Sequence, residues 1–386
     1  MPRAFFVPQQ NRRERAFLVG IRHGRQARER AEADLAELTQ LALSADLDVA
    51  GSLLAPVQRI DPAWYVGTGK SEDIRVQAET AGASAVIFDE TLSPAQVRNL
   101  EEKFQRKVLD RGNLVLDIFA RRARTREAKT QVELAQLEYL LPRLTGLWEH
   151  FSRQVGGVGT KGPGETQLEV DRRLVRTRIS HLKKLLAKIE LSREVQRTHR
   201  KQNVKVCALL GYTNAGKSSL FNRLTRLDVV AENRMFSSLD AKSSRVHLRT
   251  SDGEQGDLVV LVDTVGFVSK LPPQLVASFR STLEEVTYAD LLLGVLDLAH
   301  PDVVSHIDEV RRVITDLESE HIPRLWVLNK SDLVQRQRVL EVTLALEPDA
   351  SLPCSAATGD GLAALSLAVR DRLGLSRPPR IDLQKP

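Results

Sequence analysis

Eight residues near the middle of the chain have the types and the spacing that hold a triphosphate. They are Gly211, Tyr212, Thr213, Asn214, Ala215, Gly216, Lys217 and Ser218. An apolar stretch from Val204 precedes them, and an apolar helix start follows at Ser219. The glycines let successive backbone N–H groups point at phosphate oxygens, the lysine reaches the β- and γ-phosphates, and the serine hydroxyl ligates Mg²⁺. The stretch therefore predicts the phosphate loop of a nucleoside triphosphatase.

A second motif follows the apolar strand predicted over Leu258–Val262. It consists of Asp263, Thr264, Val265 and Gly266. An acid at this place positions Mg²⁺ through water, and the amide of a glycine can sense the γ-phosphate. Lys217, Asp263 and Gly266 are therefore the predicted catalytic residues.

Two later motifs identify the base. The strand predicted over Arg324–Leu328 ends in Asn329, Lys330, Ser331 and Asp332, and the next one ends before Ser355, Ala356 and Ala357. A carboxylate in the first motif accepts hydrogen bonds from N1–H and the exocyclic amine of guanine, which adenine cannot offer. The second motif brings small residues to the base edge. GTP and GDP are the predicted ligands.

Two positions depart from a generic GTPase. Phe267 stands where many GTPases carry a glutamine that orients the attacking water, so we expect slow turnover in isolation and a catalytic group from elsewhere. Asn214 is similar to the loop asparagine of GTPases activated by K⁺, whose carbonyl helps to hold the ion. The alternative for Asn214 is an ordinary hydrogen bond within the loop.

Length, charge and composition limit the class of protein to which the chain can belong. The chain has 386 residues, enough for two or three domains, and a net charge of +6. No apolar run approaches a membrane span and no secretory signal is recognisable, so a cytoplasmic monomer is expected. Cys207 and Cys354 each lie in an apolar strand-like run, which predicts two buried thiols.

The elements that position these motifs predict an α/β fold in four parts. Residues 1–125 form an N-terminal α/β domain, where strands at 15–21, 49–56 and 83–89 alternate with helices at 25–44, 70–81 and 93–103. Residues 126–202 form a long antiparallel helical hairpin whose glycine-rich tip loop spans 150–165. The GTPase domain covers 203–376, and 377–386 is a tail.

The N-terminal domain contains a partial phosphate-loop pattern, Gly67-Thr68-Gly69-Lys70-Ser71. The first glycine of the motif would fall at Trp64, so a glycine turn before a helix is the favoured interpretation. A second triphosphate site is the alternative.

The hairpin predicts contact with nucleic acid. Its tip loop is longer than helix closure requires, it is basic, and it begins with His150 and Phe151, which can stack on bases. A solvated helix face is the alternative reading of the charge. The predicted RNA-binding residues are Arg153, Gly156, Gly157, Gly159, Lys161, Gly162, Arg172 and Arg173.

These motifs together resemble the HflX family of ribosome-associated GTPases. The resemblance extends from about Asp61 to Arg372 and includes Tyr65–Lys70, Leu92–Gln96, Asp117–Ala123, Gly156–Arg173 and Gly211–Asn222. It implies binding to the large ribosomal subunit and its rRNA, entry of the tip loop into the peptidyl-transferase region, and splitting of stalled or idle ribosomes under stress. Some members are reported to bind ATP through the N-terminal part.

The resemblance also identifies the first switch and one difference at the C-terminus. The switch residues are Phe236, Ser237, Ser238, Leu239 and Asp240, with Ser238 where a Mg²⁺-ligating threonine is expected. Serine keeps the hydroxyl and loses the methyl that helps to fix its rotamer. Many relatives continue into a small extra domain, whereas this sequence ends soon after Leu375.

Two other functions compete with this one. The first is a GTPase that regulates a protein or membrane partner, with the hairpin as its docking site. The second is an ATP-dependent RNA remodeller that works through the N-terminal domain.

Overall fold

The computed structural model describes residues 14–24, 26–144, 163–200, 204–225, 242–249, 255–264, 266–267, 270, 286–347 and 349–375. The chain divides into two compact units. The first comprises residues 1–190 with 270–279, and the second comprises residues 191–269 with 280–386. Each unit has its own sheet and its own apolar core.

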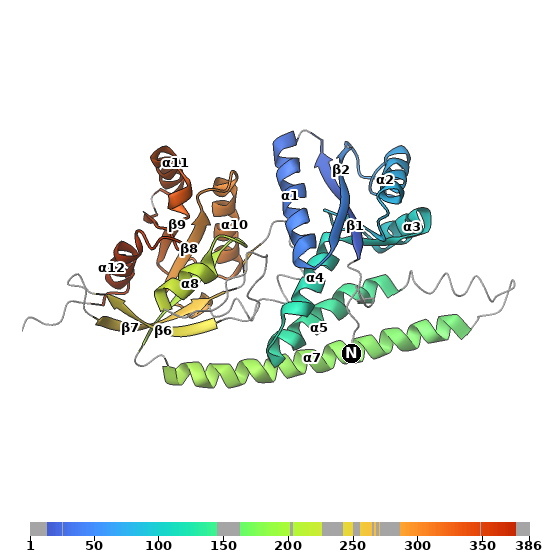
Figure 1. Cartoon of the computed structure of the whole chain (residues 1–386). Helices are drawn as coiled ribbons and strands as arrows, with labels where there is room; N and C mark the ends of the chain where they lie inside the picture. The colour runs from blue at the N-terminus through green and yellow to red at the C-terminus, as the bar shows by residue number, and fades with distance from the viewer. Residues whose placement is uncertain are drawn as a thin grey trace, which may run out of the picture. The chain divides into compact units, whose positions relative to one another are not determined.

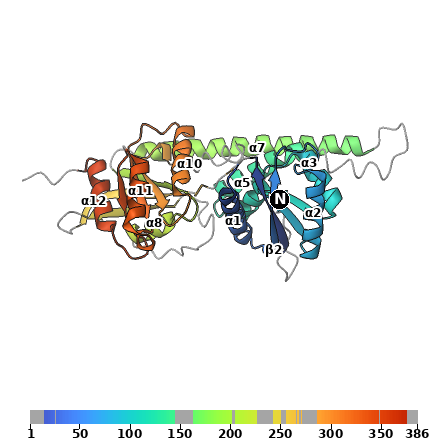
Figure 2. The same ribbon diagram turned by 90° about the horizontal axis from the view of Figure 1, so that it is seen from above.

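A parallel four-stranded sheet with the order β2-β1-β3-β4 organises the first unit. Its strands are β1 (Arg15–His23), β2 (Asp48–Val57), β3 (Ala85–Phe88) and β4 (Lys107–Asp110). The crossover helices are α1 (Arg28–Ser44), α2 (Thr68–Thr80) and α3 (Pro94–Phe104), and α4 (Arg111–Arg122) follows the last strand. Helix α1 covers one face of the sheet, and α2 and α3 cover the other (Figures 1 and 2). Helices on both faces explain why the strands are almost entirely apolar.

The predicted alternation of strands and helices is confirmed, but β4 and α4 were not predicted. Strand β4 has only four residues, and α4 follows it directly at Arg111, so no loop separates the two elements in the sequence. Helix α3 begins with a capping box: the Ser93 side chain accepts from the Gln96 amide and the Gln96 side chain accepts from the Ser93 amide, with Pro94 at the first helical position.

The hairpin helices are α5 (Arg126–Leu140), which ends in the short helix η1 (Leu141–Arg143), and α7 (Pro163–Arg200). Leu134 and Leu137 of α5 pack against Ile179 and Leu182 of α7. The two helices lie side by side (Figure 1). Helix α7 begins at Pro163, so residues 163–165, predicted to belong to the tip loop, are helical. Proline is well tolerated there, because the first turn of a helix needs no N–H from it.

The second unit is built on a six-stranded sheet with the order β10-β9-β8-β5-β7-β6. All neighbours are parallel except β6 and β7. The strands are β5 (Lys205–Gly211), β6 (Lys242–Arg249), β7 (Gln255–Asp263), β8 (Leu291–Asp297), β9 (Arg324–Asn329) and β10 (Ser351–Pro353). The helices are α8 (Lys217–Thr225), α10 (Val303–Asp316), η2 (Ser331–Leu333), α11 (Arg336–Leu346) and α12 (Leu362–Arg372).

Strand β5 is the topological switch point of this sheet, because the chain adds β7 on one side of it and β8 on the other. Ligands of open α/β sheets bind outside the carboxyl end of the strands at such a point. The residues after Gly211 therefore lie where this architecture places a ligand.

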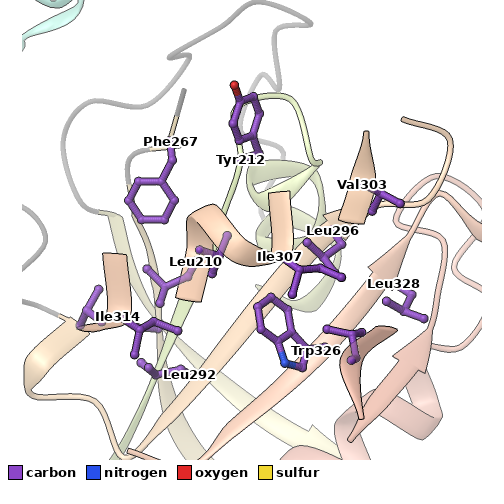
Figure 3. Close-up of a cluster of buried hydrophobic side chains, with 14 of the residues drawn as sticks. Leu210, Tyr212, Phe267, Leu292, Leu296, Val303, Ile307, Ile314, Trp326 and Leu328 are labelled. Atoms are coloured by element: carbon purple, nitrogen blue, oxygen red, sulfur yellow. The ribbon is translucent and has the colours of Figure 1, made fainter. Parts of the chain in front are cut away.

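Apolar clusters fill both faces of the second sheet. One joins Leu210, Leu292 and Trp326 to Ile307 and Ile314 of α10 (Figure 3). Cys207 and Cys354 are buried in the other, as predicted, and burial raises the pKa of each thiol to about 12. Among the described residues, no helix is long and apolar enough to cross a bilayer.

Candidate nucleotide site

The predicted phosphate loop has the required strand-loop-helix context. It leaves β5 at Gly211 and enters α8 at Lys217. Gly216 has φ +90°, and a Cβ there would lie 2.2 Å from Nδ2 of Asn329. Glycine is therefore required at this position by backbone conformation and by the close approach of the base-recognition motif.

Lys217 is buried and lies across the loop. Its ammonium donates to the carbonyl oxygens of Gly211 (3.0 Å) and Tyr212 (2.8 Å). Burial lowers the pKa of Lys217 to about 8, although the nearby Asp263 carboxylate acts in the opposite direction. The group that must neutralise phosphate charge thus has a pKa close to neutral pH in the free protein.

We expect GDP affinity to fall as the pH is raised from 7.5 to 9. The free protein loses the Lys217 proton near pH 8, so binding the anion above that pH requires proton uptake, which weakens affinity by up to about tenfold per pH unit. The lowered pKa has the opposite effect on folding, because the unfolded chain keeps the proton and stability rises with pH in this window. Mant-GDP titration checks the affinity and thermal unfolding checks the fold; a flat affinity profile would contradict the expectation.

Ser218 and Asp263 supply an oxygen pair beside the loop. The Ser218 hydroxyl donates to a carboxylate oxygen of Asp263 at 2.7 Å, and Asp263 is completely buried at the end of β7. A hydroxyl and a carboxylate suit Mg²⁺, which prefers oxygen ligands and takes few of them from the protein when phosphates and water complete the shell. These residues fit a Mg²⁺ ion, which would neutralise phosphate charge when bound.

The turn after β7 is joined directly to the phosphate loop. The Thr213 amide donates to the Phe267 carbonyl at 2.7 Å, and the Phe267 amide donates to the Gly211 carbonyl at 3.2 Å. A Cβ on Gly266 would lie 2.8 Å from both the Lys217 ammonium and the Cα atom of Thr213. Gly266 therefore lies beside the ammonium that is predicted to serve the γ-phosphate, where only glycine fits.

Two aromatic side chains of this region belong to the core. Phe267 is 5% exposed and packs in the same cluster as Tyr212 (Figure 3). The Tyr212 ring stacks on His306 of α10, with centroids 3.8 Å apart and planes 6° from parallel. The phenyl ring of Phe267 therefore stabilises the turn by packing and has no group to orient water.

The base-recognition residues connect three loops. The Asn329 side chain donates to the Ala215 carbonyl at 2.8 Å and accepts from the Ala356 amide at 3.0 Å. Asp332, in η2, is exposed, and Lys330 pairs with Asp297 at 2.6 Å. Asn329 thus holds the loops together, and the Asp332 carboxylate, predicted to bind guanine, is exposed.

Arg223 of α8 is a site residue that the sequence did not indicate. Its Nε donates to the Ala356 carbonyl at 2.9 Å, and its Nη2 donates to the Ala357 carbonyl. The arginine fixes the loop of Ala356 and Ala357, which is predicted to face the base. No local pattern signals this role, because its partners lie more than 130 residues further along the chain.

The remaining predicted site residues either form other contacts or lie outside the described residues. Thr264 donates its hydroxyl to the Leu209 carbonyl at 2.6 Å, while Ser219 is half-buried in α8 and Ser355 is buried beside Ala356. The first-switch residues 236–240, Val265 and the tip-loop residues Arg153, Gly156, Gly157, Gly159, Lys161 and Gly162 lie outside the described residues.

The partial motif in the first unit begins at Gly67, the N-cap of α2, and its other four residues form the first turn of that helix. The Lys70 ammonium pairs with Asp73 at 2.9 Å. The Ser71 hydroxyl donates to the Thr68 carbonyl and accepts from Lys103. Both side chains that would serve a phosphate are thus engaged locally, in agreement with the favoured interpretation.

Three family models match successive parts of the chain. They are described as the GTP-binding GTPase N-terminal region, residues 32–120; the GTP-binding GTPase Middle Region, residues 122–200; and 50S ribosome-binding GTPase, residues 206–330.

Curated relatives and a solved structure match most of the chain. GTPase HflX of Caldanaerobacter subterraneus is 46% identical over 84% of this chain and 74% of its own length. GTPase HflX of Escherichia coli strain K12 is 44% identical over 88% of this chain and 79% of its own. The crystal structure of the SsGBP and GDP complex is 26% identical, with a TM-score of 0.52 over 94% of this chain and 99% of that one.

Proposed function

The chain belongs to the HflX family of GTPases, and we propose that its GTP-bound form binds the large ribosomal subunit and leaves it after hydrolysis. The observation that carries the proposal is the match of residues 206–330 to the 50S ribosome-binding GTPase model, over loops that form a guanine-nucleotide site. In this proposal the binding separates the subunits of stalled or idle ribosomes under stress.

In the proposed cycle, residues of the nucleotide site have distinct tasks. Lys217 neutralises charge on the phosphates, Ser218 ligates Mg²⁺, Asp263 holds the ion through water, and the Gly266 amide contacts the γ-phosphate. Asp332 selects guanine. Ser238 is proposed as a second hydroxyl ligand of Mg²⁺.

The exposed side of α7 supports an RNA partner. Arg178 and Lys183 pair with Glu133 and Glu138 of α5, so their charges are compensated within the hairpin. Arg173, Arg176 and Lys184 are exposed and form no ion pair with a described residue. Positions 173 and 184 are three turns apart on one face, where a line of positive charge can follow a phosphate backbone. Arg172, half-buried, and the tip loop would extend this contact.

A catalytic group from outside the turn is part of the proposal, because Phe267 is buried in the core. The environment of Asn214 favours a K⁺ ion as one part of this catalytic group. Its side chain is exposed, its backbone has φ +64°, and it forms no hydrogen bond with a described residue. This arrangement differs from the ordinary loop hydrogen bond that is the alternative for asparagine here.

Sedimentation with purified ribosomal subunits tests the function. With a non-hydrolysable GTP analogue we expect the protein to pellet with the large subunit, and with GDP to remain in the supernatant. Turnover should rise with large subunits present and be faster in K⁺ than in Na⁺ buffer. Retention should decrease steeply as salt is raised. If subunits neither stimulate turnover nor retain the protein, the proposal is wrong; retention indifferent to salt and to RNase would instead favour a protein partner.

A further inference from the structure

Thr213, the third residue of the phosphate loop, buries its hydroxyl group without a protein partner. The residue is 6% exposed, and the hydroxyl oxygen forms no hydrogen bond with any residue that the structure describes. Burying such a group is unfavourable, because it loses its hydrogen bonds to water and gains none in return. Buried polar groups without a partner are rare in folded proteins, and each requires an explanation.

Two other buried threonines bond to the backbone. The Thr264 hydroxyl, in the turn after β7, donates to the Leu209 carbonyl at 2.6 Å. The Thr130 hydroxyl, in α5, donates to the Arg126 carbonyl at 2.7 Å, and this residue is 6% exposed, as Thr213 is. Burial alone therefore does not explain the state of the Thr213 hydroxyl.

Backbone contacts fix the position of Thr213. Its amide donates to the Phe267 carbonyl at 2.7 Å, and the neighbouring Tyr212 carbonyl accepts from the Lys217 ammonium at 2.8 Å. The amide is thus engaged within the protein and does not serve a phosphate oxygen. The side-chain hydroxyl is the hydrogen-bond donor that this residue can still offer to a ligand.

The Thr213 side chain lies next to the two groups that are predicted to contact the γ-phosphate. A single point, the position of the Cβ atom that Gly266 lacks, is 2.8 Å from the Lys217 ammonium and 2.9 Å from Cγ2 of Thr213. In phosphate loops the β-phosphate is held by backbone amides at the start of the following helix. Thr213 precedes these residues and is bonded to Phe267 of the turn after β7, which favours the γ-phosphate as the group that its hydroxyl meets.

We propose that the Thr213 hydroxyl donates a hydrogen bond to an oxygen of the γ-phosphate and thereby helps the site to distinguish GTP from GDP. The proposal rests on the proposed binding of GTP in this loop and does not depend on the ribosome. GTP supplies the acceptor that the hydroxyl lacks in the protein, whereas GDP has no γ-phosphate to supply it. A hydrogen bond to a charged group corresponds to about a ten- to hundredfold change in affinity.

Two substitutions separate the hydroxyl of Thr213 from the shape of its side chain. In Thr213→Val, which keeps the branched shape, we expect affinity for a non-hydrolysable mant-GTP analogue to fall about tenfold or more, and affinity for mant-GDP to stay within about twofold of the wild type. Thr213→Ser keeps the hydroxyl and should restore most of the analogue affinity. The matched control is Thr130→Val, which removes an equally buried hydroxyl from α5 and should leave both affinities unchanged.

Thermal unfolding of the nucleotide-free protein is the second readout. Removing a hydroxyl that has no protein partner should leave the unfolding midpoint of Thr213→Val unchanged or higher, because valine has no polar group to desolvate. A purely structural hydroxyl would give the opposite sign. Weaker analogue binding together with an undiminished midpoint therefore supports the contact with GTP, and a lower midpoint in Thr213→Val would contradict it.

The nucleotide affinities also distinguish the other places where the hydroxyl could act. Equal weakening of both nucleotides in Thr213→Val, or an unchanged affinity for the analogue, would each overturn the proposal. A loss of analogue affinity in K⁺ buffer but not in Na⁺ buffer would assign the hydroxyl to a monovalent ion beside Asn214 and overturn it as well. If the wild type bound neither nucleotide, the proposed function would be wrong together with this contact, which none of the other outcomes implies.

Discussion

Asp332→Asn is expected to lower GTP affinity at least a hundredfold and to create affinity for xanthosine triphosphate. The Asp332 carboxylate is exposed in η2, beside the loops that Asn329 joins, and it can accept two hydrogen bonds from guanine. An asparagine presents an N–H₂ donor to the guanine amine, which is a clash of two donors. Xanthine carries a carbonyl at that position, so the same donor finds an acceptor.

Competition of the two triphosphates against a fluorescent analogue measures this change. Asp371→Asn is the matched control, because Asp371 is an exposed aspartate of α12 and should leave the preference for GTP intact. Equal loss of both triphosphates would indicate a damaged site, and unchanged GTP affinity would assign the base to other residues.

Much of this site could be predicted because each of its motifs consists of contiguous residues. The phosphate loop, Asp263–Gly266 and Asn329–Asp332 each follow a buried strand, and the carboxyl ends of parallel strands meet at one edge of the sheet. The spacing of residues within each motif therefore predicted the ligand, and the order of strands and motifs predicted the edge of the sheet where its binding residues converge.

The remaining features depend on tertiary contacts that no local pattern carries. Arg223 reaches carbonyls more than 130 residues away, and Lys270 reaches carboxylates about 180 residues before it in the sequence. In each case the partner chosen in three dimensions, and not the neighbour in sequence, decides the role of the residue.

The predicted role of Gly216 was incomplete for the same reason, and this leads to the second large effect. The spacing indicated a backbone that curls around phosphate, whereas the structure adds that the Asn329 amide occupies the space beside the Gly216 Cα atom. Gly216→Ala would place a methyl group 2.2 Å from Nδ2 of Asn329 in a backbone with φ +90°. The variant must therefore displace the residue that also bonds Ala215 and Ala356. We expect GTP and GDP affinities to fall together by at least a hundredfold, since the phosphate and base sides of the site are disrupted at once.

Gly69→Ala is the matched control for this substitution. Gly69 precedes a lysine and a serine just as Gly216 does, but a Cβ there would meet no atom within 4 Å. Alanine also favours the helix that Gly69 already occupies. Equilibrium binding of both nucleotides should therefore be unchanged in Gly69→Ala and nearly abolished in Gly216→Ala, with circular dichroism verifying that both variants fold. If Gly69→Ala also lost nucleotide, or if ATP hydrolysis by the wild type disappeared in it, the partial motif would have to be a second nucleotide site after all. If Gly216→Ala retained tight binding, the Asn329 contact would not be the constraint that keeps glycine at this position.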